Sequence, residues 1–262
     1  MKILNSKINL DVFFQQLAES HHNILFLDYD GTLAPFQVRP EKAAPYPGIR
    51  KLLKKIQACP DTRLVIVSGR YTRDLIPLLN LRNIPEIWGS HGLERLKPDG
   101  TYRMEKIDLK TKQVFKKARE KTSDLIPPNR LEYKPGCLAL HWRGLKNDKI
   151  SEIKNKILPQ WTTLANHAQL LLKEFDGGLE LRLSGKNKGD AVREVLQETR
   201  NDFVCAYLGD DVTDEDAFKA LENRGLRALV REQLRETVAD IWLLPPLELI
   251  EFLRRWIKAC ET

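Results

Sequence analysis

The chain has 262 residues, of which 42% are hydrophobic and 30% charged, and its 43 Lys and Arg against 36 Asp and Glu give a formal net charge of +7. This composition excludes a disordered or collagen-like chain and suits a globular protein of one large or two modest domains. The cations are dispersed among acids, so we expect no nucleic-acid partner and favour a small anionic substrate. No apolar run approaches the ~18 residues that span a bilayer, and residues 1–10 hold no signal-like block, so we expect a cytoplasmic protein without membrane contact.

Short apolar runs alternate with helical segments through much of the chain. The runs, in chain order, are Ile24–Leu27, Leu64–Val67, Ile87–Trp88, Phe203–Leu208, Leu226–Val230 and Ile241–Leu244. The helices expected between or after them are Pro47–Ala58, Thr72–Leu79, Lys188–Thr199, Asp214–Leu221 and Pro245–Lys258. Uniformly apolar strands separated by helices indicate a parallel sheet that is covered on both faces. The sequence therefore predicts an α/β protein with a doubly wound core.

The middle of the chain follows a different pattern. The elements expected there are a hairpin of Leu93–Lys97 and Tyr102–Glu105, a helix at Leu109–Ser123, strands at Leu131–Lys134 and Cys137–Trp142, a helix at Asp148–Ala165, and strands at Leu170–Glu174 and Leu179–Leu183. Turns are expected at Pro135-Gly136 and at Asp176-Gly177-Gly178. Antiparallel hairpins that interrupt a parallel pattern indicate an inserted domain. We place this domain at residues 95–185, so that residues 1–94 and 186–262 form one discontinuous core.

The strongest local signal is the segment Asp28-Tyr29-Asp30-Gly31-Thr32, which directly follows the apolar run Ile24–Leu27. Two carboxylates just past a buried strand lie where open α/β sheets bind ligands, and Gly31 allows a sharp turn there. A bare pair of aspartates would be an ordinary polar loop. The preceding strand and the following Gly-Thr favour a functional site.

Three further stretches supply what two carboxylates lack. Ser68-Gly69-Arg70 follows a strand and offers a hydroxyl and backbone amides to an anion, although alone it would be a simple turn. Lys188 opens a helix and could place a cation near a phosphate, although alone it would be a solvated helix-end lysine. Gly209–Asp216 contains five acids in seven residues after a strand. Some of these acids can cap the helix, but Asp210 and Asp211 precede it, and a bound Mg²⁺ would compensate their repulsion.

These four stretches resemble, in order and context, the motifs of the haloacid-dehalogenase-like phosphatases, and more narrowly the trehalose-6-phosphate phosphatase family. The segments similar to that family are Asp28–Pro35, Ser68–Arg70, Gly89–Glu94, Leu140–Arg143, Leu179–Arg182 and Gly209–Phe218. One segment departs from it, because Leu183–Asn187 stands where many members carry a Pro-containing run. The resemblance implies a mixed α/β cap domain for substrate specificity at the position of the insertion.

The resemblance also implies a Mg²⁺-dependent hydrolysis of trehalose 6-phosphate through an aspartyl-phosphate. Asp28 would attack phosphorus, and Asp30 would protonate the leaving oxygen and later activate water. The Ser68 hydroxyl and Lys188 would neutralise charge on the transferring group. The metal ligands that the resemblance implies are the Asp28 carboxylate, the Asp30 backbone carbonyl and Asp210, with Asp211 and Asp214 as auxiliary ligands.

The cap would read the sugar, whose hydroxyls are well matched by charged side chains. The residues expected to bind substrate are Arg70, His91, Lys134, His141, Arg143, Glu180 and Arg182. Each also has an ordinary structural interpretation, such as an exposed strand arginine or a core histidine. By strand alternation the five cap residues cannot all share a face, whereas His141 matches Arg143 and Glu180 matches Arg182. Glu180 is the first candidate.

Other functions stay open at the level of sequence. Phosphatases of sucrose phosphate and of glucosyl- or mannosyl-3-phosphoglycerate share the motifs and have related caps. A non-catalytic sugar-phosphate-binding regulator would keep the fold, but Asp28 and Asp30 are both present and argue against it. A phosphomutase or nucleotidase would use the same core with a different cap. The expected partners are a small sugar phosphate and, functionally, a trehalose-6-phosphate synthase.

Overall fold

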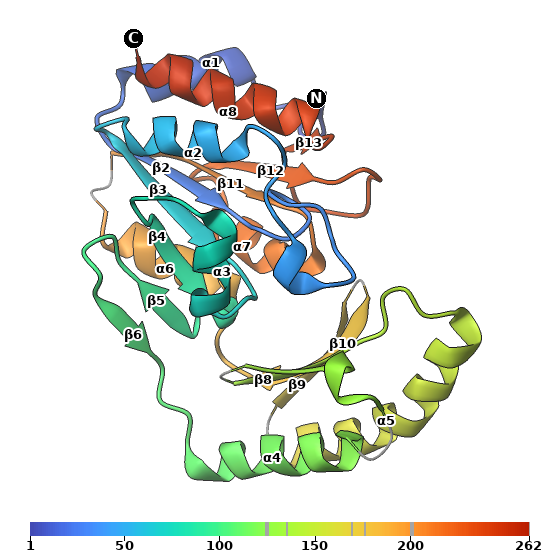
Figure 1. Cartoon of the computed structure of the whole chain (residues 1–262). Helices are drawn as coiled ribbons and strands as arrows, with labels where there is room; N and C mark the ends of the chain where they lie inside the picture. The colour runs from blue at the N-terminus through green and yellow to red at the C-terminus, as the bar shows by residue number, and fades with distance from the viewer. Residues whose placement is uncertain (124–125, 135, 169, 176, 200–201, 262) are drawn as a thin grey trace. The chain divides into compact units, whose positions relative to one another are not determined.

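The computed structural model describes residues 1–261 except 124–125, 135, 169, 176 and 200–201 (Figure 1). The turn residues expected at Pro135 and Asp176 therefore lie outside the described residues. The chain divides into two compact units, one made of Met1–Arg103 with Asn187–Thr262 and the other of Met104–Lys186. In the described part of the chain, no helix is long and apolar enough to cross a membrane.

The first unit is built on a nine-stranded sheet. In spatial order its strands are β1 (Lys2–Ile3), β13 (Ile241–Leu243), β12 (Leu226–Val230), β11 (Val204–Gly209), β2 (Asn23–Leu27), β3 (Thr62–Val67), β4 (Glu86–Gly89), β5 (Glu94–Leu96) and β6 (Tyr102–Met104). The six strands from β13 to β4 run parallel, whereas β1 and β5 pair antiparallel with their neighbours. Of the central strands, β2 is buried throughout and β11 is buried from Cys205 onward, as the uniformly apolar runs predict.

Helices cover both faces of this sheet. On one face lie α1 (Leu10–Glu19), α2 (Ile49–Gln57), α3 (Thr72–Leu79) and α8 (Leu247–Cys260), and on the other lie α6 (Lys188–Gln197) and α7 (Glu215–Ala220) (Figure 1). Strand β2 contributes to both cores, because Leu25 and Leu27 pack on the first layer and Ile24 and Phe26 on the second. Short 3-10 helices are η1 (Pro40–Lys42), η2 (Ser90–Gly92) and η4 (Val212–Asp214). The doubly wound α/β core is confirmed.

The second unit has its own antiparallel sheet and its own core. In spatial order the strands are β7 (Leu131–Lys134), β8 (Cys137–His141), β10 (Gly178–Leu183) and β9 (Leu170–Phe175). Helices α4 (Leu109–Ser123) and α5 (Asn147–Ala168) pack against one face, and η3 (Pro128–Arg130) precedes β7. Along each strand, successive side chains point alternately toward the helices and away from them. On the side of the helices, Leu138, Leu140 and Leu181 are buried in one cluster with Phe115 and Trp161.

Strands β5 and β6, expected in the inserted domain, belong to the large sheet. Strand β5 pairs with β4, and its Arg95 is buried between Glu86 and Glu198, with N–O distances of 2.8 and 2.5 Å. Arg103 pairs with Glu194 of α6 at 2.6 Å. These ion pairs tie the hairpin to the first unit, so that the second unit begins at Met104 and not at residue 95.

Candidate active site

The site residues of the first unit lie at the carboxyl ends of neighbouring central strands. Asp28 follows β2 and Asp210 follows β11, and the Asp28 amide donates to the Leu208 carbonyl at 2.9 Å. Ser68 follows β3, the neighbour of β2 on the other side. From β2 the chain continues to β3 on one side, and from β11 it continues to β12 on the other side. The carboxyl ends of β2 and β11 therefore form the switch point at which open α/β sheets bind ligands.

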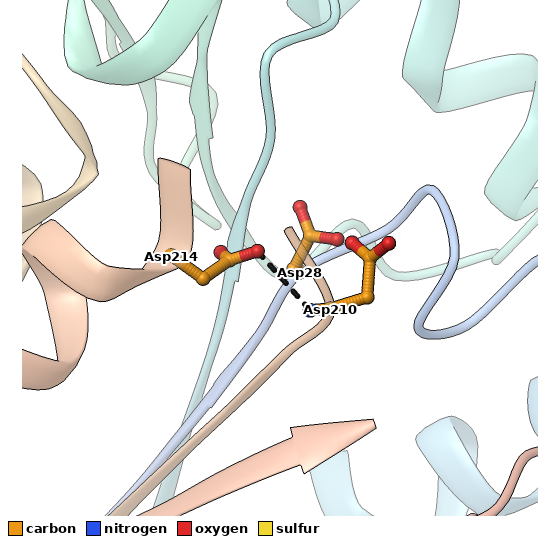
Figure 2. A group of neighbouring side chains, drawn as sticks. All are labelled: Asp28, Asp210 and Asp214. Atoms are coloured by element: carbon orange, nitrogen blue, oxygen red, sulfur yellow. Dashed lines mark hydrogen bonds between the residues drawn. The ribbon is translucent and has the colours of Figure 1, made fainter. Parts of the chain in front are cut away.

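Three buried carboxylates meet at this edge (Figure 2). Ligand oxygens of Asp28, Asp210 and Asp214 lie within 4.8 Å of one another, and the three residues are 3%, 2% and 0% exposed. Burial raises the pKa of Asp28 to about 7 and that of Asp210 well above its usual range. Gly31 makes the approach possible, because a Cβ there would lie 2.2 Å from Asp210 Oδ2.

Lys188 supplies the compensating charge. It is the first residue of α6, which Asn187 and Asp190 fix through a capping box. Its Nζ donates to Asp28 Oδ1 at 2.7 Å and to Asp214 Oδ1 at 2.8 Å. Burial alone would lower the pKa of Lys188, but the two carboxylates outweigh it and raise that pKa, so the lysine stays charged.

The three carboxylates differ in how fully their oxygens are hydrogen-bonded. Asp214 Oδ1 accepts from Lys188 and from the Tyr207 hydroxyl at 2.6 Å, and its Oδ2 accepts from the Asp211 amide at 3.0 Å. Its Oδ2 also accepts from the Asp210 amide at 3.1 Å, the bond drawn in Figure 2. Among the described residues, by contrast, the buried Oδ2 of Asp210 has no hydrogen-bond partner. An orphaned buried carboxylate oxygen beside Asp28 fits a divalent cation that prefers hard oxygen ligands.

The carboxylates of Asp30 and Asp211, two residues also expected at the metal, lie outside this group of three. Within the described residues, the group that could hold a metal comprises Asp28, Asp210 and Asp214 and does not include the carboxylate of Asp211. The Asp30 carboxylate accepts a two-pronged bond from Arg70, whose Nε and Nη2 each lie 2.6 Å from one of its oxygens. Arg70 Nη1 also donates to the Pro40 carbonyl at 2.9 Å. Arg70, expected at the substrate, thus orients Asp30 in this structure.

Ser68 and His91 complete this part of the site. The Ser68 hydroxyl oxygen accepts from the Arg70 amide at 3.1 Å, and the side chain is 1% exposed. His91 follows β4 with a left-handed backbone (φ 55°), and its amide donates to the Ser68 carbonyl at 3.1 Å. Its ring packs on Gly69, where a Cβ would lie 2.6 Å from the imidazole. His91 therefore lies beside the Ser68 turn in the first unit.

The residues expected to read the sugar, apart from Arg70 and His91, lie in the second unit. Strand β8 lies between β7 and β10, and its Cys137 stands opposite both Lys134 and Arg182. Two residues further along β8, Ala139 stands opposite Glu180, and His141 follows two residues after that. Directly paired residues share a face. Lys134, His141, Glu180 and Arg182 therefore share the face opposite to α4 and α5, which we call the polar face.

One expectation about this unit needs correction. Strand β8 ends at His141, so Arg143 lies in the following loop and does not alternate with His141 on a strand. The five cap residues do not all share a face, in agreement with strand alternation. The register between strands, which the sequence does not reveal, brings four of the five to the polar face.

Two residues with close contacts to the predicted set were missed from the sequence. Tyr207 lies inside the apolar run of β11. A tyrosine in a buried strand needs a hydrogen-bond partner for its hydroxyl, and this was the only signal of its contact with Asp214. Glu132, on the polar face, binds Lys134 Nζ at 3.0 Å and His141 Nε2 at 2.9 Å. Burial would raise the pKa of Glu132, but these two neighbours lower it to about 2. The signal available in the sequence was that Glu132 stands two residues before Lys134 on the same strand, and therefore on the same face.

Comparisons with known proteins agree on one family. A sequence model of the family described as trehalose-phosphatase matches residues 26–239. The probable trehalose-phosphate phosphatase E of Arabidopsis thaliana is 30% identical over 272 residues, which cover 97% of this chain and 75% of that protein. The trehalose-phosphate phosphatase of Mycobacterium marinum is 31% identical over 252 residues, which cover 91% of this chain and 62% of that protein.

Solved structures show the same architecture. The C-terminal domain of the C. albicans trehalose-6-phosphate phosphatase superposes with a TM-score of 0.81 and 20% identity, and 100% of each chain is covered. At this identity the likeness is evidence for the fold alone.

Proposed function

The chain belongs to the trehalose-phosphatase family, as its motifs predict, and from this premise we propose that it hydrolyses trehalose 6-phosphate to trehalose and phosphate at the Asp28 site. The observation that carries the proposal is the contact of Lys188 with both Asp28 and Asp214 at the switch point of the sheet. A nucleophilic carboxylate held by a buried cation suits attack on a phosphoryl group, whose charge must be neutralised.

Asp28 acts as the nucleophile. One of its carboxylate oxygens attacks phosphorus, and the bond from phosphorus to the sugar oxygen breaks. Asp30 donates a proton to that leaving oxygen and later takes a proton from the water that attacks the aspartyl-phosphate. Phosphate then leaves, and Asp28 is regenerated.

Arg70, Ser68 and Lys188 orient and neutralise the reacting groups. Arg70 binds both oxygens of Asp30 and so orients the carboxylate, and each oxygen keeps a second lone pair that can carry the proton for the sugar oxygen. Lys188 uses two of its three N–H donors on Asp28 and Asp214, and the third is available to the phosphoryl oxygens. The Ser68 hydroxyl, at the end of the neighbouring strand, can donate to the same group.

Asp28 and Asp210 would hold the Mg²⁺ that such phosphatases generally use, with the Asp30 carbonyl as a third ligand. The orphaned oxygen of Asp210 supports this assignment. When bound, the ion would neutralise charge on the transferring phosphoryl group. Asp214 is already saturated by four donors, so we assign it to holding Lys188 and the Asp210 loop.

The polar face of the second unit would bind the sugar. Glu132, Lys134, His141, Glu180 and Arg182 provide both acceptors and donors, which suit the hydroxyls of a disaccharide. Arg143 and His91 remain candidates for substrate contact. A cytoplasmic location and a trehalose-6-phosphate synthase as functional partner stay predictions.

A substrate panel tests the function. Phosphate release would be measured with trehalose 6-phosphate, sucrose 6-phosphate and glucosyl-3-phosphoglycerate, each with Mg²⁺ and with EDTA. We expect the highest kcat/KM for trehalose 6-phosphate and no turnover in EDTA. A preference for another glycoside phosphate would leave the phosphatase and overturn the substrate. Full activity in EDTA would overturn the metal.

A further inference from the structure

Tyr207 lies beneath the catalytic carboxylates in the middle of β11. It is 0% exposed, and its ring stacks on Phe26 at 6.1 Å and meets Phe218 edge-on at 5.7 Å. These aromatic contacts hold the ring independently of its hydroxyl. The hydroxyl donates to Asp214 Oδ1 at 2.6 Å. None of the steps proposed above uses this hydroxyl.

The contact matters because Asp214 Oδ1 is shared. The same oxygen accepts from Lys188 Nζ, and Lys188 in turn donates to the nucleophile Asp28. The other oxygen, Oδ2, accepts from the Asp210 and Asp211 amides. Four donors therefore hold this carboxylate, two on each oxygen, and of these four the Tyr207 hydroxyl is the one that a conservative substitution removes.

We propose that Tyr207 is a positioning residue for phosphoryl transfer: its hydroxyl fixes Asp214, and Asp214 holds the Lys188 ammonium against Asp28. The inference rests on the proposed function and deepens it. Tyr207 itself touches neither substrate nor the reacting atoms. It acts through Asp214 on the placement of a charge that the transition state needs.

A change at this hydroxyl would affect chemistry more than substrate binding. Without it, Asp214 Oδ1 has Lys188 as its remaining side-chain donor, so the carboxylate can turn and draw the ammonium away from Asp28. Misplacing a catalytic group by about 1 Å can cost up to ~10²-fold in rate. We expect Tyr207→Phe to lower kcat about tenfold. KM for the disaccharide phosphate should stay within about twofold, because uniform binding is kept.

The experiment uses the whole chain, four single variants and one double variant. Tyr207→Phe is compared with Asn23→Ala, which removes another buried side-chain hydrogen bond of the first unit, from Asn23 Nδ2 to the Leu17 carbonyl at 3.1 Å, at the opposite end of β2. Both should lower the thermal unfolding midpoint, but only Tyr207→Phe should lower kcat. Equal kcat values for Tyr207→Phe and the wild type, or equal losses in both variants, would overturn the proposal.

A double-variant cycle tests whether Tyr207 acts through Asp214. If it does, Tyr207→Phe adds no further loss in kcat when Asp214 is already replaced by Ala. Multiplying losses would mean that the hydroxyl acts independently, which contradicts the proposal. Asp28→Asn separates a failure of the proposed function from a failure of the role of Tyr207. If that variant retains turnover, the proposed function fails, whereas loss in Asp28→Asn with full activity in Tyr207→Phe leaves the function intact and removes only the role of Tyr207.

Discussion

The two sheets of this molecule place their polar groups at different parts of a strand. In the parallel sheet of the first unit, both faces are covered by helices, and the polar groups stand past the strand ends, at Asp28, Ser68 and Asp210. In the antiparallel sheet of the second unit, one face packs on α4 and α5, and charged side chains line the other along the strands. A sheet that is covered on both faces can offer a ligand only the carboxyl ends of its strands, whereas a sheet that is packed on one side can offer its whole open face.

This difference suggests a division of labour. The edge of the parallel sheet gathers few groups at short distances, which suits bond making at one phosphorus atom. The polar face spreads donors and acceptors over several strands, which suits recognition of a larger sugar. The predictions below test whether losses in the first unit affect every substrate and losses in the second affect only the disaccharide phosphate.

The largest effect is expected at the nucleophile. Asp28→Asn cannot form the aspartyl-phosphate, and we expect kcat to fall by at least ~10³-fold with both trehalose 6-phosphate and a small phosphoester such as p-nitrophenyl phosphate. Steady-state phosphate release with both substrates measures it. A loss confined to the disaccharide phosphate would break the comparison, because it would place recognition at the edge of the parallel sheet.

The next effect concerns the metal and depends on pH. Burial raises the carboxylate pKa values of Asp28, to about 7, and of Asp210, so a cation must displace a proton at low pH. We expect Mg²⁺ affinity, measured by calorimetry, to weaken about tenfold per pH unit below pH 7 for one displaced proton. Asp210→Asn should weaken Mg²⁺ binding at every pH. Affinity that does not change between pH 6 and pH 8 would contradict the assignment.

The same contrast explains what could be predicted from the sequence. At the carboxyl ends of the parallel strands, Asp28 and Ser68 directly follow an apolar run and Asp210 follows one after a single glycine, so their positions could be predicted from local pattern alone. The ion pair between Arg70 and Asp30 joins residues 40 positions apart and could not. Strands β5 and β6 were assigned to the wrong unit because a hairpin pattern says nothing of the neighbour with which it pairs.

On the polar face, local pattern was insufficient. Alternation gives the face of a residue within its own strand, but only the register between β7, β8 and β10 brings Lys134 and Glu180 to one face. Glu132 was missed for the same reason, since its partner His141 is on another strand.

A moderate effect, selective for substrate, is expected at Glu180. Glu180→Gln should raise KM for trehalose 6-phosphate roughly 10- to 100-fold, equivalent to losing about one or two hydrogen bonds to a charged group, and leave hydrolysis of p-nitrophenyl phosphate within about twofold. The matched control is Glu174→Gln, on the opposite face of the same sheet, where the side chain pairs with Lys154. Equal losses on the two substrates would mean that Glu180 supports the fold or the catalytic edge.

The smallest effect is one of stability, at Glu132. Lys134 and His141 lower its pKa in the folded state to about 2, against an ordinary value near 4.5. A depressed acid pKa contributes stability that is present above pH ~4.5 and is lost as pH falls toward 2. We therefore expect Glu132→Gln to lower the thermal unfolding midpoint at pH 7 by a few degrees, and the difference from wild type to shrink between pH 5 and pH 2.

Burial decides how large that difference is, and the chain offers a control. Glu152 has a pKa lowered to about 2 by hydrogen bonds to Lys149 and Lys156, but it lies exposed on α5, where solvent screens such pairs. Glu152→Gln should therefore leave the unfolding midpoint nearly unchanged at every pH. Equal shifts in the two variants would show that the ion pairs of Glu132 are as screened as a surface pair, and the polar face would then lack the dry, preorganised groups that sugar recognition by this sheet requires.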